Sequence, residues 1–263
     1  MSGIAAAVLA GIANMALRGA PASYSAVNAT ALVIALVIAA LLPVPQRHRT
    51  VSAALLAGLI LLTLPSMLGP SDEGITRWLR LGPIQLHAGM LVVPALLILA
   101  IRKGGAATLT LAAAALIMAF QPDAGTTSAL ALAAIVAALE KRDRWSAVAA
   151  LGCLAAACAA AMQPDPLRGV PFVEHVLRDA WAAAPLLALA LTLMTSAAIG
   201  IPLWLHRSTQ KGRSEAIAFA AFFLGLIIAA QLKEYPVPLI GYGAAAIIGY
   251  GTGMAMLLKH DRA

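Results

Sequence analysis

Apolar runs alternate with short polar breaks along the whole chain. Runs of about 18 or more apolar residues recur, close to the length of helix that crosses a hydrocarbon core of about 30 Å. We therefore predict an all-α polytopic membrane protein with about ten transmembrane helices, forming a single integral membrane domain over residues 1–263. The predicted spans are residues 2–18, 26–44, 50–69, 84–101, 104–120, 126–139, 146–162, 180–205, 215–232 and 237–258.

Composition supports this class of protein. Hydrophobic residues make up 62% of the 263 residues and charged residues 11%, which excludes an ordinary soluble domain. Cys153 and Cys158 lie in one apolar run and project from different sides of a helix. Both are expected to be core residues, and neither a disulfide framework nor a metal site is predicted.

Basic residues gather in alternate connections between the spans. If the amino terminus is cytoplasmic, the cytoplasmic segments hold about 12 of the 18 Lys and Arg residues, and the positive-inside rule places both termini in the cytoplasm. These residues are Arg47, Arg49, Arg102, Lys103, Lys141, Arg142, Arg144, Arg207, Lys211, Arg213, Lys259 and Arg262. The net charge of +7 reflects this topology, so membrane lipid and not nucleic acid is the predicted environment.

Two polar segments on the opposite, outer side are long enough to hold a functional site: an outer interfacial segment, residues 70–86, and a large outer loop, residues 163–181. In the first, Arg77 and Arg80 are three residues apart and would share one face of a short interfacial helix. Two guanidinium groups there would hold a phosphate. The alternative is that they pair with the neighbouring Asp72 and Glu73. His87, just beyond, is expected to bond to a helix.

The large outer loop carries two charged pairs at helical spacing. Glu174 and Arg178 are four residues apart, as are His175 and Asp179, so both pairs fit within a lid helix on the membrane surface. In the alternative interpretation, Asp165, Glu174 or Asp179 is a general base and His175 shuttles a proton.

A polar island interrupts the apolar sequence from Gln121 to Thr127. Its Pro, Asp and Gly residues predict a turn at the bilayer surface, with Gly125 allowing unusual backbone angles and Thr126 free to cap the next helix.

Three segments together resemble the SEDS proteins (shape, elongation, division and sporulation), the FtsW and RodA group. Residues 76–85, Thr-Arg-Trp-Leu-Arg-Leu-Gly-Pro-Ile-Gln, look like that family's RRWI-x-LG-x-x-Q segment. Residues 121–127, Gln-Pro-Asp-Ala-Gly-Thr-Thr, match its QPD-x-GT turn, and residues 238–243, Pro-Leu-Ile-Gly-Tyr-Gly, are similar to its PF-x-SYGG segment. The order of the motifs and the predicted topology agree as well, so the resemblance covers nearly the whole chain.

The resemblance implies a SEDS-like protein of the bacterial inner membrane that acts in cell shape, elongation or division. Its expected activity is that of a lipid II glycosyltransferase, polymerising peptidoglycan glycan strands beside a single-span class B penicillin-binding transpeptidase. The undecaprenyl-linked substrate would lie in a groove open to the membrane. The expected catalytic acid is Asp165 or Glu174, and the expected substrate-binding residues are Arg77, Arg80, Gln85, Gln121, Asp123, Thr126 and His175. No cofactor is expected to be required, and an active enzyme could use a divalent cation.

The sequence departs from the family pattern where catalysis is expected. The family's catalytic aspartate precedes a Phe, and alignment of that Phe with Phe172 puts Pro171 at the aspartate position. After Gln85, the family's Pro-Ser-Glu and a later Lys are replaced by Leu86-His87-Ala88 and Leu91. Besides an enzyme that uses Asp165 or Glu174 instead, two further functions stay open: a non-catalytic scaffold or regulator of an envelope complex, and a transporter of a lipid-linked precursor.

Overall fold

The computed structural model describes residues 1–82, 84–207 and 212–259. Pro83, Lys211 and Arg262, which enter the sequence predictions, lie outside the described residues. The elements are α1 (Ser2–Leu17), α2 (Ala22–Leu41), α3 (His48–Leu68), β1 (Trp78–Leu81), β2 (Ile84–His87), α4 (Ala88–Lys103), η1 (Gly105–Thr108), α5 (Leu109–Ala119), α6 (Ala124–Lys141), α7 (Arg144–Ala161), α8 (Val176–Ala183), α9 (Pro185–Leu205), α10 (Arg213–Leu232) and α11 (Ala244–Leu258).

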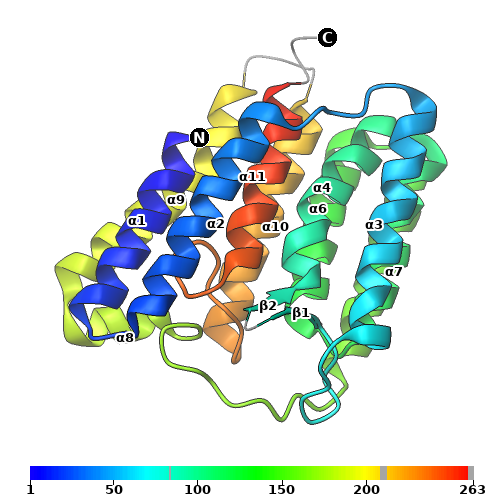
Figure 1. Cartoon of the computed structure of the whole chain (residues 1–263). Helices are drawn as coiled ribbons and strands as arrows, with labels where there is room; N and C mark the ends of the chain where they lie inside the picture. Colours follow the sequence, from blue (N-terminus) through cyan, green and yellow to red (C-terminus); the bar gives the residue numbers. More distant parts are fainter. Residues whose placement is uncertain (83, 208–211, 260–263) are drawn as a thin grey trace.

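The helices confirm the predicted membrane architecture. Within the described residues, each predicted span contains an apolar helix; the span predicted over 104–120 is formed by η1 and α5 together, and the span predicted over 180–205 holds α8 and α9. Six helices, α2, α3, α6, α7, α9 and α10, are long and apolar enough to cross a membrane, whereas α1, α11 and the η1–α5 segment are shorter apolar helices. The chain is therefore a multi-pass membrane protein. Figure 1 shows that α1 begins and α11 ends at the same end of the bundle, opposite the β-hairpin. We call the hairpin end the outer end.

Helices α4 and α11 lie in the middle of the bundle and approach each other closely. A side chain at Gly249 of α11 would overlap the backbone of Met90 in α4, and one at Gly251 would overlap Ala35 of α2. Glycines at these positions therefore let both neighbouring helices pack directly against the α11 backbone. Consecutive helices α2 and α3 end up on different sides of this centre, since α2 packs on α11 and α3 packs on α4 (Figure 1).

The outer interfacial segment forms a β-hairpin, so the predicted interfacial helix is wrong. Leu79 pairs with Leu86 on one face, and Arg80 pairs with Gln85 on the other. Polar and apolar side chains alternate along both strands, which favours extended backbone over the helical spacing of Arg77 and Arg80. The strands place Arg77 and His87 at the base of the hairpin, where both are buried.

Two further element boundaries differ from the prediction. The span predicted over residues 180–205 breaks at Ala184, because Pro185 begins a new helix and separates α8 from α9. The last span begins at Ala244, leaving residues 237–243 as a loop. The side chain of Asn28 in α2 donates to the carbonyl oxygen of Gly241 (2.9 Å) and accepts from the backbone N–H of Gly243 (3.1 Å), which holds that loop against the bundle.

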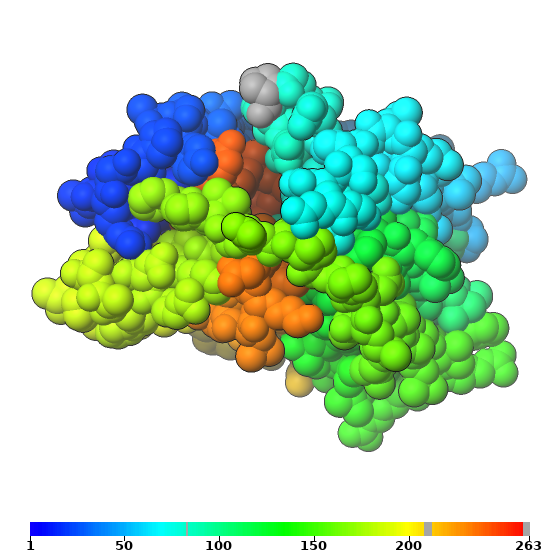
Figure 2. Space-filling view, turned by 90° about the horizontal axis from the view of Figure 1, so that it is seen from below, coloured from blue at the N-terminus to red at the C-terminus, as the bar shows by residue number. Residues whose placement is uncertain are grey.

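The large outer loop crosses the outer end of the bundle. Figure 2 shows it as a yellow-green band between the blue N-terminal helices and the cyan hairpin side, next to the orange connection between α10 and α11. Two backbone hydrogen bonds join the loop to that connection: Val237 N–H to Val173 (3.0 Å) and Tyr242 N–H to Phe172 (2.7 Å). The loop is thus fixed over the centre of the molecule.

Candidate functional site

The turn from Gln121 to Thr127 is buried, and several of its polar groups bond to the protein, whereas Gln121 Oε1, Asp123 Oδ2 and Thr126 Oγ1 have no hydrogen-bond partner among the described residues. The Gln121 side-chain amide donates to the carbonyl oxygen of Leu62 (2.5 Å). Asp123 caps α6 by accepting the backbone N–H of Thr126 (3.1 Å), and the Thr127 hydroxyl donates to the Asp123 carbonyl oxygen (2.6 Å). Asp123, and not Thr126, is therefore the helix cap. These bonds make the turn an architectural element.

Arg77 connects four segments near the outer end. Its Nη1 donates to Asp165 Oδ2 (3.0 Å), to the hydroxyl of Tyr235 (3.1 Å) and to the carbonyl oxygen of Pro122 (3.4 Å). The guanidinium also lies 4.7 Å from the ring centre of Trp78 and 4.8 Å from that of Tyr235. Arg77 pairs with an acid of the distant outer loop and not with the neighbouring Asp72 or Glu73. Its Nε is buried without a hydrogen-bond partner among the described residues.

Burial and charge set the ionisation of this cluster. Burial by itself lowers the pKa of Arg77, but the nearby Asp123, Tyr235 and Asp165 raise it by more, so the pKa lies above its ordinary value. The guanidinium therefore stays charged. Burial, with a contribution from Asp123, raises the pKa of Tyr235 to about 12. Burial also lowers the pKa of His87, although Asp123 Oδ2 lies 3.5 Å from its Nε2 and opposes that effect.

His87 has a structural role at the start of α4. Its Nδ1 accepts the backbone N–H of Met90 (3.3 Å) and thereby caps the helix, which confirms the expected helix-bonded histidine. Because the pKa of its ring is lowered by burial, His87 is neutral around pH 7, and Arg77 is the cation that faces Asp123 and Asp165.

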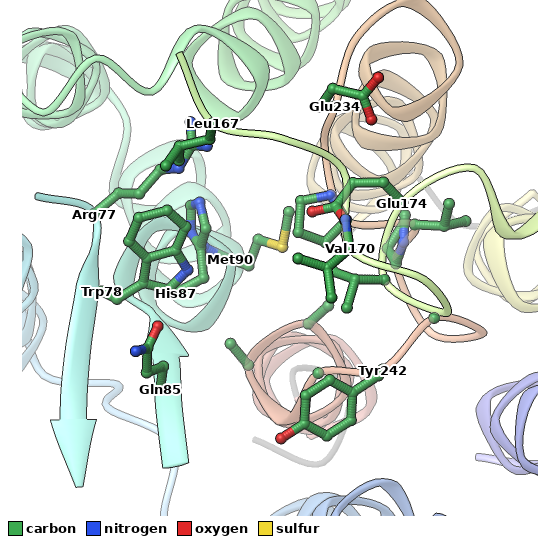
Figure 3. A pocket seen from close by; sticks show the side chains of 18 of the residues that line it. Arg77, Trp78, Gln85, His87, Met90, Leu167, Val170, Glu174, Glu234 and Tyr242 are labelled. Carbon is green, nitrogen blue, oxygen red and sulfur yellow. The ribbon is translucent and has the colours of Figure 1, made fainter. Parts of the chain in front are cut away.

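A cavity of about 260 Å³ opens beside Arg77 at the outer end. Figure 3 shows Arg77, Trp78, His87 and Gln85 on its hairpin side, with Val170 and Glu174 of the outer loop across from them and Tyr242 on a third side. Its polar lining is Tyr24, Asp72, Arg77, Gln85, His87, Arg168, Glu174, Glu234 and Tyr242. The cavity therefore combines cations, carboxylates and aromatic side chains at one end of a membrane bundle.

Glu174 is the predicted catalytic acid that lines this cavity. It precedes α8, so the predicted intrahelical pair with Arg178 is not formed; its Oε2 accepts the backbone N–H of Val170 (2.6 Å). Burial, with a smaller contribution from Glu234, raises the pKa of Glu174, partly offset by the Val170 N–H. A carboxylate with a raised pKa is suited to accept a proton near neutral pH.

The loop around Glu174 adopts strained backbone conformations. Phe172 has φ of 67° and His175 has φ of 57°, both in the left-handed region that residues other than glycine rarely occupy. The His175 Nε2 lies 2.5 Å from Glu234 Oε2 of the α10–α11 connection, a side-chain contact that takes the place of the predicted pair with Asp179. Such strain persists where surrounding contacts hold the chain, and it concentrates at functional sites.

The structure divides the predicted site residues into four groups. Arg77, Gln85 and Glu174 line the cavity. Asp165 and His175 contact lining residues, through Arg77 and Glu234 respectively. Gln121, Asp123 and Thr126 lie in the buried turn, and Arg80 is exposed on the hairpin outside the cavity lining.

Sequence reasoning missed Arg168, Glu234, Tyr24 and Tyr242 as cavity residues. The rings of Tyr24 and Tyr242 stack at 3.8 Å, although their positions are 218 residues apart in number. Of these four, only Tyr242 could have been found from the sequence, because it lies within the third family-like motif. The others reach the cavity through contacts between distant parts of the chain, which a single sequence does not reveal.

The described residues do not form a resident metal site. In this part of the chain, no group of three or more His, Cys, Asp or Glu side chains is arranged to hold a metal ion.

Comparison with known proteins identifies the fold. No protein-family model matches the sequence, and no curated protein matches it. The rod shape determining protein RodA of Thermus thermophilus has a similar structure, with a TM-score of 0.74 and 21% identity over 98% of this chain and 94% of that chain. A mutant of that RodA gives a TM-score of 0.69 and 22% identity, covering 98% of this chain and 95% of that one.

A chain of a peptidoglycan synthase complex, solved to explain how polymerization and crosslinking are coordinated, gives a TM-score of 0.64. Its identity is 21%, over 99% of this chain and 96% of that chain. At this level of identity the likeness concerns the fold. The chain has the SEDS-like fold of RodA.

Proposed function

We propose that this protein is a SEDS-like cell-wall biogenesis protein of the bacterial inner membrane, with both termini in the cytoplasm, and that it handles an undecaprenyl-linked precursor. The RodA-like fold over nearly the full length of both chains supports this assignment. So does the position of the cavity at the end of the bundle opposite the termini, where a lipid-linked sugar outside the cell would be met. The observation that carries the proposal is the placement of Glu174 and Arg77 on opposite sides of one cavity.

The proposed activity is glycosyl transfer from lipid II. A sugar hydroxyl of the acceptor attacks the anomeric carbon of the donor, and the bond from that carbon to the pyrophosphate oxygen breaks. Glu174 takes the proton of the hydroxyl, while the electron pair leaves with the undecaprenyl pyrophosphate. Arg77 and Arg168, which line the cavity, would stabilise the departing negative charge. Arg168 is exposed and has no ion-pair partner among the described residues, so its charge is available to a ligand.

Glu174 suits the role of base better than Asp165. The Asp165 carboxylate is engaged by Arg77 at 3.0 Å and does not line the cavity. The Glu174 carboxylate accepts one hydrogen bond, from the backbone N–H of Val170, and lines the cavity. Its pKa is raised because it is partly buried. This arrangement supports a base that replaces the acid missing at Pro171.

Glycan synthesis by the purified protein tests the activity. Wild type given lipid II in detergent should produce glycan strands, and Glu174→Gln should reduce the rate by at least about 100-fold, the usual contribution of a general base. Asp179→Asn is the matched control, because Asp179 belongs to the same loop but lies outside the cavity lining. Its rate should stay close to that of wild type. Folded wild type that makes no glycan, alone or with a partner transpeptidase, would exclude the enzyme.

A non-catalytic scaffold is the second candidate function. Two carboxylates near Arg77 favour it, because both are already bonded to the protein: Asp165 pairs with Arg77, and Asp123 caps α6. Fewer acids are then left to act on a substrate. A scaffold should be recovered from native membranes together with a single-span envelope protein, such as a class B penicillin-binding transpeptidase. Recovery of the chain alone would count against this function.

Uptake of a lipid-linked precursor into vesicles tests the third candidate function, a transporter.

The proposed orientation can be tested by labelling. In a variant without Cys153 and Cys158, a cysteine in place of the exposed Ser71 should react with a membrane-impermeant thiol reagent added outside the cell. A cysteine in place of Arg47 should be protected. The reverse pattern would overturn the assigned topology.

A further inference from the structure

A second cavity, of about 200 Å³, lies on the side of the bundle between α6 and α10, away from the cavity that Glu174 lines. Its walls include Ser128 and Leu132 of α6 and Ile228 and Leu232 of α10. Leu232, Ile228 and Ser128 are among the outward-facing side chains of their helices. The cavity is therefore a groove on the lipid-facing surface of the protein.

Small residues create this groove. At Gly225 the two helices touch, since an added side chain would meet the backbone of Ala129 at 2.7 Å. From Gly225 to Lys233 the groove follows α10 toward the outer end, a length of about 12 Å at a helical rise of about 1.5 Å per residue. That length and apolar lining suit one extended hydrocarbon chain.

The outer mouth of the groove is positively charged. Lys233 follows the last residue of α10 and is exposed, and it has no ion-pair partner in the described part of the chain. No Asp or Glu is among the described residues that line the groove. The Ser128 hydroxyl lies in the same lining and adds a hydrogen-bond donor. An apolar channel that ends in an unpaired cation complements a molecule with a hydrocarbon tail and an anionic head.

We propose that this groove binds an anionic phospholipid, with one acyl chain along α6 and α10 and its phosphate against Lys233. The depth fits, because α10 ends at the outer end of the bundle, where the headgroups of that leaflet lie. The site is separate from the proposed active site and does not depend on glycosyl transfer. Tyr235 separates the two: its ring lines the groove, and its hydroxyl accepts a hydrogen bond from Arg77 at 3.1 Å.

Photo-crosslinking in vesicles tests the site. The full chain would be reconstituted separately with phosphatidylglycerol or phosphatidylcholine carrying a diazirine on one acyl chain, and labelled peptides would be mapped. Peptides that contain Ser128–Leu132 and Ile228–Leu232 should be labelled, about fivefold more by phosphatidylglycerol, the preference expected from one lysine at an anionic surface. Lys233→Gln should abolish that preference. Arg178→Gln, which removes an exposed cation of the outer loop, should keep it.

A second pair of variants separates occupancy of the groove from general contact with lipid. Ser128→Leu fills the mouth and should remove labelling by both lipids, whereas Ala155→Leu adds the same bulk to an exposed position of α7 and should not. Thermal unfolding shows that each variant is folded. Three outcomes would each overturn the proposal. The first is equal labelling by both lipids in wild type, and the second is labelling of this groove that is no stronger than labelling of the exposed face of α3. The third is a partner's membrane helix crosslinked at Ser128 in native membranes.

Discussion

The turn at Gln121–Thr127 and the large outer loop both place carboxylates near Arg77, but their surroundings differ. Asp123 is fully buried, caps α6 and lies in a segment whose backbone and side chains bond to the protein. Glu174 is half-buried, accepts a hydrogen bond from one backbone N–H and borders a cavity beside strained backbone. The first carboxylate contributes to folding, whereas the second is free to meet a ligand.

This difference shows why the most recognisable motif need not hold the chemistry. In the buried turn, a substitution that removes the hydrogen bonds of Asp123 or Thr127 would leave their buried partners unpaired, which is costly. The outer loop is held by a few contacts with the α10–α11 connection, and its Glu174 borders the cavity. Four substitutions test the contrast, in order of the expected change in stability.

Asp123→Ala should cause the largest loss, about 3 kcal/mol in the free energy of unfolding, because it removes the cap of α6 and a buried negative charge that compensates Arg77. Unfolding in detergent by a chemical denaturant would measure it. Asp123→Asn keeps the capping oxygen and should lose clearly less. If both variants unfold like wild type, the turn is not the architectural element described above.

Gly125→Ala should destabilise the protein by about 2 kcal/mol, because the added methyl group would lie 2.5 Å from the ring of Tyr235, which Arg77 holds in place. Gly200 of α9 is the matched control, since nothing lies within 4 Å of a side chain added there. Gly200→Ala should be neutral or stabilise by a few tenths of a kcal/mol. The midpoint of thermal unfolding distinguishes the two, and equal shifts would contradict close packing at Gly125.

His175→Ala should cost at most about 1 kcal/mol, because its side-chain contact with Glu234 is partly exposed to solvent. Its main effect should be local, because the pair with Glu234 helps hold the outer loop against the α10–α11 connection. Limited proteolysis should cut the loop faster in this variant and in Glu234→Gln, with no further increase in the double variant. Additive increases would mean that the two residues act separately.

Glu174→Gln should change stability least and in the favourable direction. The pKa of Glu174 is raised in the folded protein, so folding favours the protonated form. Wild type should therefore lose stability relative to Glu174→Gln as the pH rises from the ordinary carboxyl value of 4.5 through the raised pKa, and the difference should stay constant above it. Thermal unfolding across this pH range measures the effect. A variant that is less stable than wild type at neutral pH would contradict a burial-raised pKa.

The same titration gives the sign of any pH dependence in activity. Glu174 accepts a proton only when it is ionised, so glycan synthesis should fall as the pH decreases through the raised pKa. Asp179→Asn should follow the wild-type profile. An activity that rises toward low pH would exclude Glu174 as the base.

The sequence by itself determined the membrane architecture. Apolar runs of membrane-spanning length predict the long helices within a few residues, because in lipid the backbone must satisfy its own hydrogen bonds and a continuous helix does so. The three motifs also predicted the RodA-like fold. Local sequence misled at the hairpin. The helical spacing between Arg77 and Arg80 competed with alternation of polar and apolar residues, and the chain is extended there, with Leu79 and Leu86 partly buried on one face and Arg80 and Gln85 exposed on the other.

Only the tertiary structure decided which polar groups form the site. The partner of Arg77 is Asp165, 88 positions away, while nearby Asp72 and Glu73 remain exposed. Glu174 and Glu234 come together because the outer loop and the α10–α11 connection pair their backbones. Ion pairs depend on distance and burial in three dimensions, and a single sequence records neither, so it identified the acids without showing which of them face a cavity.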